Sequence, residues 1–228
     1  MTNLQSLPDP KTIDAIIFDF GGVLFDIDYY APVREFKKLG FDDFESFYSK
    51  KNQAELFDDM EVGKAHEDEF LEQLRPLVLE GVSDSQIMDA WDSILLSIPK
   101  ERAELVHELK NSFRTFILSN TNSFHVASFE KKMDDTIGLA WFKSAFEKVY
   151  YSNEIGVKKP VPATYLALCE WNSLSPERTL FIDDSVQHVK GAVTAGLKGY
   201  WLDLGKENIL TALASWRWIV CWDHFLDW

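Results

Sequence analysis

The sequence predicts an α/β protein in which a parallel sheet carries helices on both faces. Short apolar runs alternate with segments of helical periodicity, which is the pattern of such a sheet. In addition, residues 19–114 contain far more helical pattern than a crossover between two strands needs. Both features indicate a Rossmann-like core with an inserted helical cap. We assign residues 12–29 and 99–228 to the core and residues 30–98 to the cap.

Five segments rich in apolar, β-branched and aromatic residues are the expected strands. They are Ile13 to Phe18, Thr115 to Leu118, Lys148 to Tyr151, Thr179 to Ile182, and Gly199 to Leu202. Helices are expected over Ser123 to Met133, Ala163 to Trp171, and Val186 to Ala195. Polar residues directly follow four of the strands, and open α/β sheets bind ligands at these carboxyl ends. A cap inserted after the first strand would cover them like a lid.

The composition restricts the partners of the protein. The chain of 228 residues has 23 Lys and Arg against 37 Asp and Glu, and its net charge of −14 argues against binding to nucleic acid or to an anionic membrane surface. Cys169 and Cys221 are the only cysteines, so neither a disulfide framework nor a thiolate zinc site is expected. No apolar run reaches the roughly 20 residues that cross a bilayer. We expect a cytoplasmic protein whose partner is a small molecule.

Three carboxylates follow the first and fourth expected strands, namely Asp19, Asp183 and Asp184. Two carboxylates about 4 Å apart repel by roughly 4 kcal/mol at an effective dielectric constant near 20, and a third increases the repulsion. A divalent cation would relieve it, and a set of oxygen ligands favours Mg²⁺. The alternative for Asp183 and Asp184 is a helix N-cap, because a helix is expected directly after them.

Other strand ends carry groups suited to a phosphate ligand. Gly21 and the glycine after it allow the backbone to approach a ligand closely. Ser119 and Asn120 offer a hydroxyl and an amide as hydrogen-bond donors to phosphate oxygens. Lys159 offers an ammonium group to a phosphoryl dianion or to a carboxylate. Each group alone is common at a turn or on a surface, so the prediction depends on their combination.

In this order the four motifs resemble those of the haloacid dehalogenase (HAD) superfamily, whose members are mostly Mg²⁺-dependent phosphatases. The resemblance extends from about Asp14 to Asp203. It implies that Asp19 is the nucleophile, with Ser119 and Lys159 as the other catalytic residues. The implied metal ligands are Asp19, the backbone carbonyl of Gly21, Asp183, and Asp184, and the implied phosphate-binding residues are Ser119, Asn120, and Lys159.

The expected reaction is hydrolysis of a small phosphorylated metabolite through a covalent aspartyl-phosphate. A carboxyl group with an ordinary pKa near 3.9 is ionised at neutral pH, so Asp19 needs no activating base. It needs only relief from repulsion by the incoming phosphate, and Mg²⁺ and Lys159 would supply that relief.

One position departs from the usual pattern of the superfamily. Most of its phosphatases carry a second Asp two residues after the nucleophile, as general acid and base, but Gly21 stands there in this sequence. Loss of such a group typically costs about 10²- to 10⁴-fold in rate. Asp26 and Asp28 are the nearest candidates to replace it.

A first motif with glycine in place of the second Asp is similar to that of α-D-glucose-1-phosphate phosphatases. The matching segments are Asp19 to Val23, Asp26 to Asp28, Leu118 to His125, and the pair Asp183 and Asp184. An anomeric phosphate has a better leaving group than an alkyl phosphate and needs a strong acid less. A sugar phosphate is therefore the expected substrate.

Two other functions are compatible with the sequence. Gly21 favours a regulatory protein that has kept the fold and lost turnover, whereas the four retained motifs argue against it. A metal-free 2-haloacid dehalogenase is the other alternative, but such enzymes usually lack the acidic pair of the fourth motif.

Three of four further features have both a structural and a functional interpretation. His125 is either a substrate contact or a structural helix residue, and Glu61 either reaches toward the cleft or caps the next cap helix, which we favour. His188 stands where relatives often carry Asn. The tryptophans of the tail pack on the sheet edge or form a homodimer contact; they are Trp216, Trp218, Trp222, and Trp228.

Overall fold

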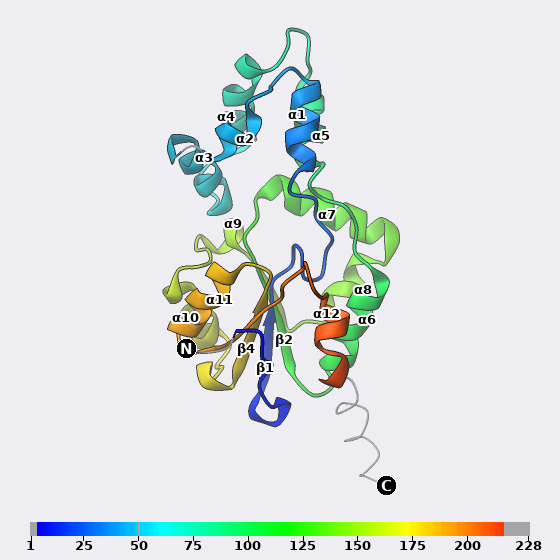
Figure 1. The fold of residues 1–228 in the computed structure, drawn as a ribbon, viewed down its shortest axis with the longest axis vertical. Coiled ribbons are helices and arrows are strands. Elements are labelled where there is room, and N and C mark those ends of the chain that lie inside the picture. Colours follow the sequence, from blue (N-terminus) through cyan, green and yellow to red (C-terminus); the bar gives the residue numbers. More distant parts are fainter. Residues whose placement is uncertain (1–3, 50, 217–228) are drawn as a thin grey trace.

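The computed structural model describes residues 4–49 and 51–216 (Figure 1). A five-stranded parallel sheet has the strand order β3-β2-β1-β4-β5. Its strands are β1 Ala15–Phe18, β2 Arg114–Ser119, β3 Lys148–Tyr151, β4 Thr179–Asp183, and β5 Lys198–Trp201. The predicted fold class is confirmed, and each expected strand is found within two residues of its predicted bounds.

Helices cover both faces of the sheet (Figure 1). One face packs against α6 Lys100–Leu109, α7 Ser123–Thr136, α8 Leu139–Lys143, and α12 Ile209–Ala212. The other packs against α10 Pro162–Trp171 and α11 Val186–Thr194. Because both faces are covered, β1 and β4 are buried throughout, which explains the apolar runs of residues 15–18 and 180–182.

The remaining helices lie between β1 and β2 in the sequence. They are α1 Ala31–Lys38, α2 Phe44–Ser49, α3 Lys51–Glu61, α4 Glu67–Leu74, and α5 Asp84–Asp92. They have an apolar cluster of their own, built around aromatic rings such as Phe36, Phe44, Phe70 and Trp91. Figure 1 shows this helical group beyond the carboxyl ends of the strands. A division of the chain into cap and core at residues 30 and 98 remains our proposal.

Short elements connect these parts. They are η1 Pro10–Thr12, η2 Arg75–Leu77, η3 Pro176–Arg178, and α9 Ser152–Ile155, which follows β3 directly. The two segments that lead into and out of the helical group pair with each other, because Asp26 N–H donates to Ser97 O at 2.7 Å and Leu96 N–H donates to Asp26 O at 3.1 Å. None of the described helices has the length and apolar character to cross a membrane.

The tail enters the structure only in part. Trp216 is buried and its ring lies 5.3 Å from that of Phe113. Trp218, Trp222 and Trp228 lie outside the described residues, so a homodimer contact through them stays a prediction.

The turn after α3 rests directly on the core. Gly63 has a φ of 72°, and a Cβ at this position would lie 2.2 Å from the carbonyl oxygen of Asn153 in α9. Only glycine combines this backbone conformation with such a close approach.

We therefore expect Gly63→Ala to lower the free energy of unfolding by about 2–4 kcal/mol, through backbone strain and the clash together. Gly81 is the matched control, because its φ is 88° but its Cβ would meet nothing within 4 Å. Gly81→Ala should cost only the backbone strain, about 1–2 kcal/mol. Urea unfolding of both variants tests this, and equal losses would contradict the importance of the contact with Asn153.

Candidate active site

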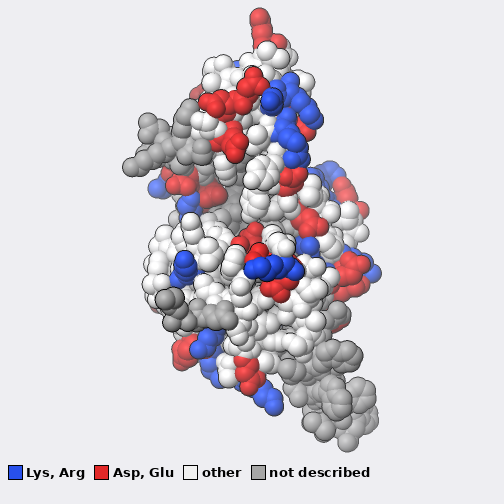
Figure 2. Space-filling view, in the orientation of Figure 1, with Lys and Arg blue, Asp and Glu red and all other residues white. Residues whose placement is uncertain are grey.

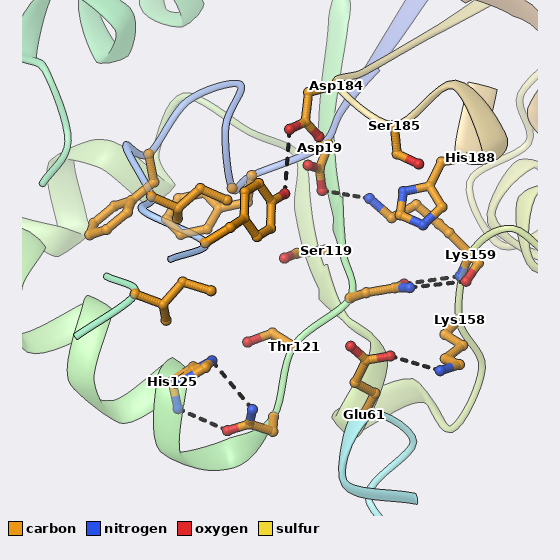
Figure 3. A pocket seen from close by; sticks show the side chains of 18 of the residues that line it. Asp19, Glu61, Ser119, Thr121, His125, Lys158, Lys159, Asp184, Ser185 and His188 are labelled. Atoms are coloured by element: carbon orange, nitrogen blue, oxygen red, sulfur yellow. Dashed lines mark hydrogen bonds and ion pairs between the residues drawn. The ribbon is translucent and has the colours of Figure 1, made fainter. Parts of the chain in front are cut away.

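The carboxyl ends of β1, β2 and β4 bring the predicted residues to one cleft of about 530 Å³ (Figure 3). Phe18 is in register with Ile117 of β2 and with Ile182 of β4, so the residues that follow these three positions are neighbours. Asp19, Ser119, Asn120, Lys159 and Asp184 all line the cleft. Asp183 lies beneath them and is fully buried.

The three predicted metal ligands with side-chain carboxylates are close together. One oxygen from each of Asp19, Asp183 and Asp184 lies within 4.8 Å of the others. Burial, with the neighbouring negative charges, raises the pKa of Asp19 to about 8 and that of Asp184 to about 6. These shifts reflect the cost of holding several negative charges in a buried site, and a hard divalent cation bound by oxygen would offset that cost.

Lys159 lies between two of these carboxylates. Its Nζ is 2.5 Å from Asp19 Oδ1 and 2.7 Å from Asp183 Oδ2, and the residue is only 1% exposed. Burial alone would lower the pKa of Lys159, but the two carboxylates outweigh it and the pKa is raised. The same ammonium group keeps the pKa of Asp183 below its ordinary value despite burial.

The first motif packs tightly against the acidic pair. Gly21 lines the cleft, as its predicted role requires. Gly22 has a φ of 77°, and a Cβ there would lie 2.6 Å from Asp184 Oδ2. The second glycine thus permits a backbone approach that no other residue allows.

Further side chains hold the acidic pair in place. His188 Nδ1 lies 3.0 Å from Asp183 Oδ2, and the Ser185 N–H donates to Asp183 Oδ1 at 2.7 Å. The N-cap interpretation of the fourth motif is wrong, because Ser185 is the N-cap of α11 and no side chain caps this helix. His188 thus forms a hydrogen bond to the acidic pair.

Two contacts to Asp184 were not foreseen from the sequence. Tyr29 Oη donates to Asp184 Oδ2 at 3.4 Å, and Trp201 Nε1 donates to Asp184 O at 2.9 Å. Tyr29 follows the first motif closely, but only the fold shows that it turns back into the cleft.

Neither predicted substitute for the missing acid is placed to donate a proton in the cleft. Asp26 pairs with Arg102 at 2.8 Å, and Asp28 pairs with Arg34 at 2.6 Å. Neither is among the residues that line the cleft. The pairing of each residue with an arginine does not favour Asp26 or Asp28 as the replacement acid, and the identity of that acid stays open.

Glu61 lines the cleft from the helical group and accepts a hydrogen bond from Lys158 Nζ at 2.8 Å (Figure 3). Asp58 also pairs with Lys158. The structural interpretation of Glu61 as a cap for the next helix is wrong, because α4 begins after His66 and Glu61 ends α3.

His125 is buried where α7 meets the helical group. Its ring stacks on Trp91 with centroids 5.0 Å apart, and its Nε2 lies 3.7 Å from Asp92 Oδ1, too far for a hydrogen bond. Burial lowers the pKa of His125 to about 4, although a hydrogen bond with the Trp91 backbone opposes the shift.

This burial makes stability depend on pH. The unfolded chain takes up a proton at His125 below about pH 6.5, whereas the folded protein does so only near pH 4, so stability is lost as the pH falls through this window. We expect the wild type to lose about 3 kcal/mol more than His125→Gln between pH 7 and pH 4. Denaturant unfolding at both pH values measures this difference. Asp19 and Asp184 have raised pKa values, so they change the stability in the opposite direction as the pH falls, but they do so in both proteins and their contributions cancel in the comparison. Equal losses would show that the ring is charged in the folded state.

A parallel α/β sheet with clustered carboxylates and a buried lysine at its strand ends defines a class of protein. Comparison with known proteins identifies that class. Residues 13–196 match the haloacid dehalogenase-like hydrolase family, so the chain belongs to this family. A D-ribitol-5-phosphate phosphatase from Bacteroides thetaiotaomicron is 30% identical over 195 residues, which cover 86% of this chain and 94% of the relative.

Solved structures agree with this assignment. A HAD-family enzyme from Bacteroides thetaiotaomicron, in complex with magnesium and inorganic phosphate, gives a TM-score of 0.77 at 31% identity, over 86% of this chain and 96% of that one. A HAD-like hydrolase from Porphyromonas gingivalis gives a TM-score of 0.77 at 32% identity, over 90% and 98%.

These comparisons confirm the predicted superfamily and enzyme class, and the magnesium complex agrees with the predicted cofactor. The finer similarity to α-D-glucose-1-phosphate phosphatases stays a prediction. The roles of the individual site residues are likewise proposals.

Proposed function

We propose that this protein is an Mg²⁺-dependent phosphatase that hydrolyses a sugar phosphate or sugar-alcohol phosphate through an aspartyl-phosphate on Asp19. The observation that carries the proposal is the contact of one buried ammonium group, that of Lys159, with both Asp19 and Asp183 at the strand ends. The relative that acts on D-ribitol 5-phosphate supports the choice of substrate class.

The residues fit a magnesium site. Asp19, Asp183 and Asp184 would hold the ion together with the backbone carbonyl of Gly21, since their oxygens lie close together and burial disfavours their charges. When bound, Mg²⁺ would neutralise charge on the nucleophile and on the phosphate oxygens.

The chain's own residues account for the remaining chemistry. An oxygen of Asp19 attacks phosphorus, a new O–P bond forms, and the ester O–P bond breaks as the leaving oxygen takes a proton from water. Ser119 and Lys159 bind the phosphate oxygens, so the negative charge is balanced during the transfer. Water then attacks phosphorus, which releases inorganic phosphate and regenerates the Asp19 carboxylate.

The charges of the cleft favour a substrate with a single phosphate. Lys158 and Lys159 are the lysines among its lining residues, and each is in contact with two carboxylates. The end of the cleft near Lys158 thus carries more negative than positive charge, with Asp58 and Glu61 against one ammonium group. A second phosphate there would be repelled, whereas a chain of neutral hydroxyl groups would not.

The surface charge is in keeping with a small-molecule substrate. On the face shown in Figure 2, Lys and Arg are interspersed with Asp and Glu and do not form a continuous basic surface. The chain as a whole has a net charge of −14.

A regulatory protein without turnover is the second candidate, favoured by Gly21 and by the outward positions of Asp26 and Asp28. A haloacid dehalogenase is less favoured, because the paired carboxylates of Asp183 and Asp184 suit a cation that such an enzyme does not hold.

A substrate panel separates these candidates. We expect phosphate release from ribitol 5-phosphate and from sugar monophosphates with Mg²⁺, a loss of activity with EDTA, and at least tenfold lower kcat/KM for sugar bisphosphates, which corresponds to about 1.4 kcal/mol of repulsion. The absence of phosphate release from every compound would favour the regulatory candidate. Activity unchanged by EDTA would exclude the metal-dependent mechanism.

A further inference from the structure

The position of the Lys159 ammonium group depends on the backbone that carries it. Lysine has a flexible stem of four carbons, so its Nζ can reach two carboxylates at once only if its Cα is well fixed. Lys159 lies in the connection between α9 and α10, outside any helix or strand. Its peptide bond to Pro160 is cis.

Asn120 fixes this connection through both ends of its amide. Its Oδ1 accepts a hydrogen bond from Lys159 N–H at 2.9 Å, and its Nδ2 donates to Lys159 O at 2.9 Å. The two residues are 39 positions apart, so this contact exists only in the folded protein. Asn120 follows the last residue of β2, an interior strand that pairs with both β3 and β1, and is therefore well anchored.

We propose that Asn120 is the positioning residue for Lys159. It holds both backbone polar groups of Lys159 so that the ammonium group bridges Asp19 and Asp183. The significance of this for turnover rests on the proposed phosphatase function. The sequence indicated Asn120 as a phosphate ligand, whereas in the structure the two heavy atoms of its amide already serve the Lys159 backbone.

The residue type matches this role. One side chain must accept from an N–H and donate to a C=O, and the amide of Asn carries an acceptor and a donor on two separate atoms, so it binds both groups without a change of protonation. The two residues at the end of β2 thus have different contacts. The Ser119 side chain faces the cleft, as Figure 3 shows, and the Asn120 side chain binds the backbone of Lys159.

Other contacts, besides the two hydrogen bonds of Asn120, also hold the connection between α9 and α10. Thr164 Oγ1 donates to Lys158 O at 2.9 Å. On the far side, a Cβ at Gly191 of α11 would lie 2.2 Å from Pro160 O, so α11 and the connection are in direct backbone contact. These contacts hold the residues on either side of Lys159. Among the hydrogen bonds of the described residues, those to the N–H and C=O of Lys159 itself come from Asn120 alone.

Asn120→Ala removes both hydrogen bonds, and Asn120→Asp keeps the acceptor. Asn208→Ala is the matched control: Asn208 also binds two backbone groups, Leu210 N–H and Thr211 N–H, but it caps α12. With ribitol 5-phosphate and Mg²⁺, we expect kcat to fall about 10- to 100-fold in Asn120→Ala and less in Asn120→Asp, with KM changed less than about threefold. Asn208→Ala should lose stability and keep its kcat.

Crystal structures of the wild type and of Asn120→Ala test the same inference without turnover. We expect Lys159 Nζ in the variant to lose hydrogen-bond contact with Asp19, with Asp183, or with both. If both contacts persist, or if kcat is unchanged, Asn120 does not position Lys159. If the wild type releases no phosphate, the proposed function fails, and the crystal structures still decide the role of Asn120.

Discussion

Asp19→Asn is expected to abolish phosphate release, with kcat reduced by more than about 10³-fold, because the amide cannot attack phosphorus. The substitution keeps the size of the side chain. It removes one of three clustered carboxyl groups and leaves Lys159 its contact with Asp183. The free energy of unfolding should therefore change by no more than about 1–2 kcal/mol, since the relieved repulsion offsets the lost ion pair.

Two measurements make this result specific. In rapidly quenched reactions, mass spectrometry should detect a phosphoryl group on Asp19 of the wild type and none at this position in the variant. Asp14 supplies the control, because it lies before β1 at the opposite end of the strand and pairs with Arg178 at the surface. Asp14→Asn should retain full activity. Retention of more than about a tenth of the wild-type rate by Asp19→Asn would rule out Asp19 as the nucleophile.

The parts of this site that follow local sequence patterns were predictable. Asp19 directly follows β1, Ser119 and Asp183 end β2 and β4, and parallel strands bring their carboxyl ends to one edge. The period of the apolar residues indicates where the strands end, and the spacing of the motifs indicates which polar residues follow them. The same holds for the helical group, because its length and periodicity exceed what a crossover needs.

The contacts that orient the site were not predictable, because they join residues far apart in the sequence. Lys159 could be assigned to the site, but its bridge between Asp19 and Asp183 depends on how the connection to α10 is held. The contact of Glu61 with Lys158 spans 97 positions. Such pairings depend on tertiary packing and leave no periodic signal.

The missing general acid illustrates the same limit. Asp26 and Asp28 are the acidic residues nearest to the nucleophile in the sequence, yet both face arginines outside the cleft. Proximity along the chain does not decide which way a loop residue points. Tyr29, one position further, lines the cleft and contacts Asp184, although nothing in its sequence context marks it.

Lys159→Met is expected to have the largest effect on stability. Methionine has a similar volume, but it leaves the buried carboxylates of Asp19 and Asp183 without their cation. Removal of one partner from a buried ion pair typically costs about 3–5 kcal/mol. We expect a loss of this size in urea unfolding with EDTA, together with a large decrease in kcat.

The neighbouring lysine provides a matched comparison. Lys158 pairs with Asp58 and Glu61, whose side chains are 62% and 29% exposed, so Lys158→Met should cost no more than about 1 kcal/mol. Mg²⁺ should restore part of the stability of Lys159→Met, because a bound cation would again balance the charges of Asp19, Asp183 and Asp184. It should restore less in Asp184→Asn/Lys159→Met, which has lost a proposed ligand. Similar losses for the two single lysine variants would show that the buried bridge contributes no more than a surface pair, and no response to Mg²⁺ would argue against a metal site formed by these three carboxylates.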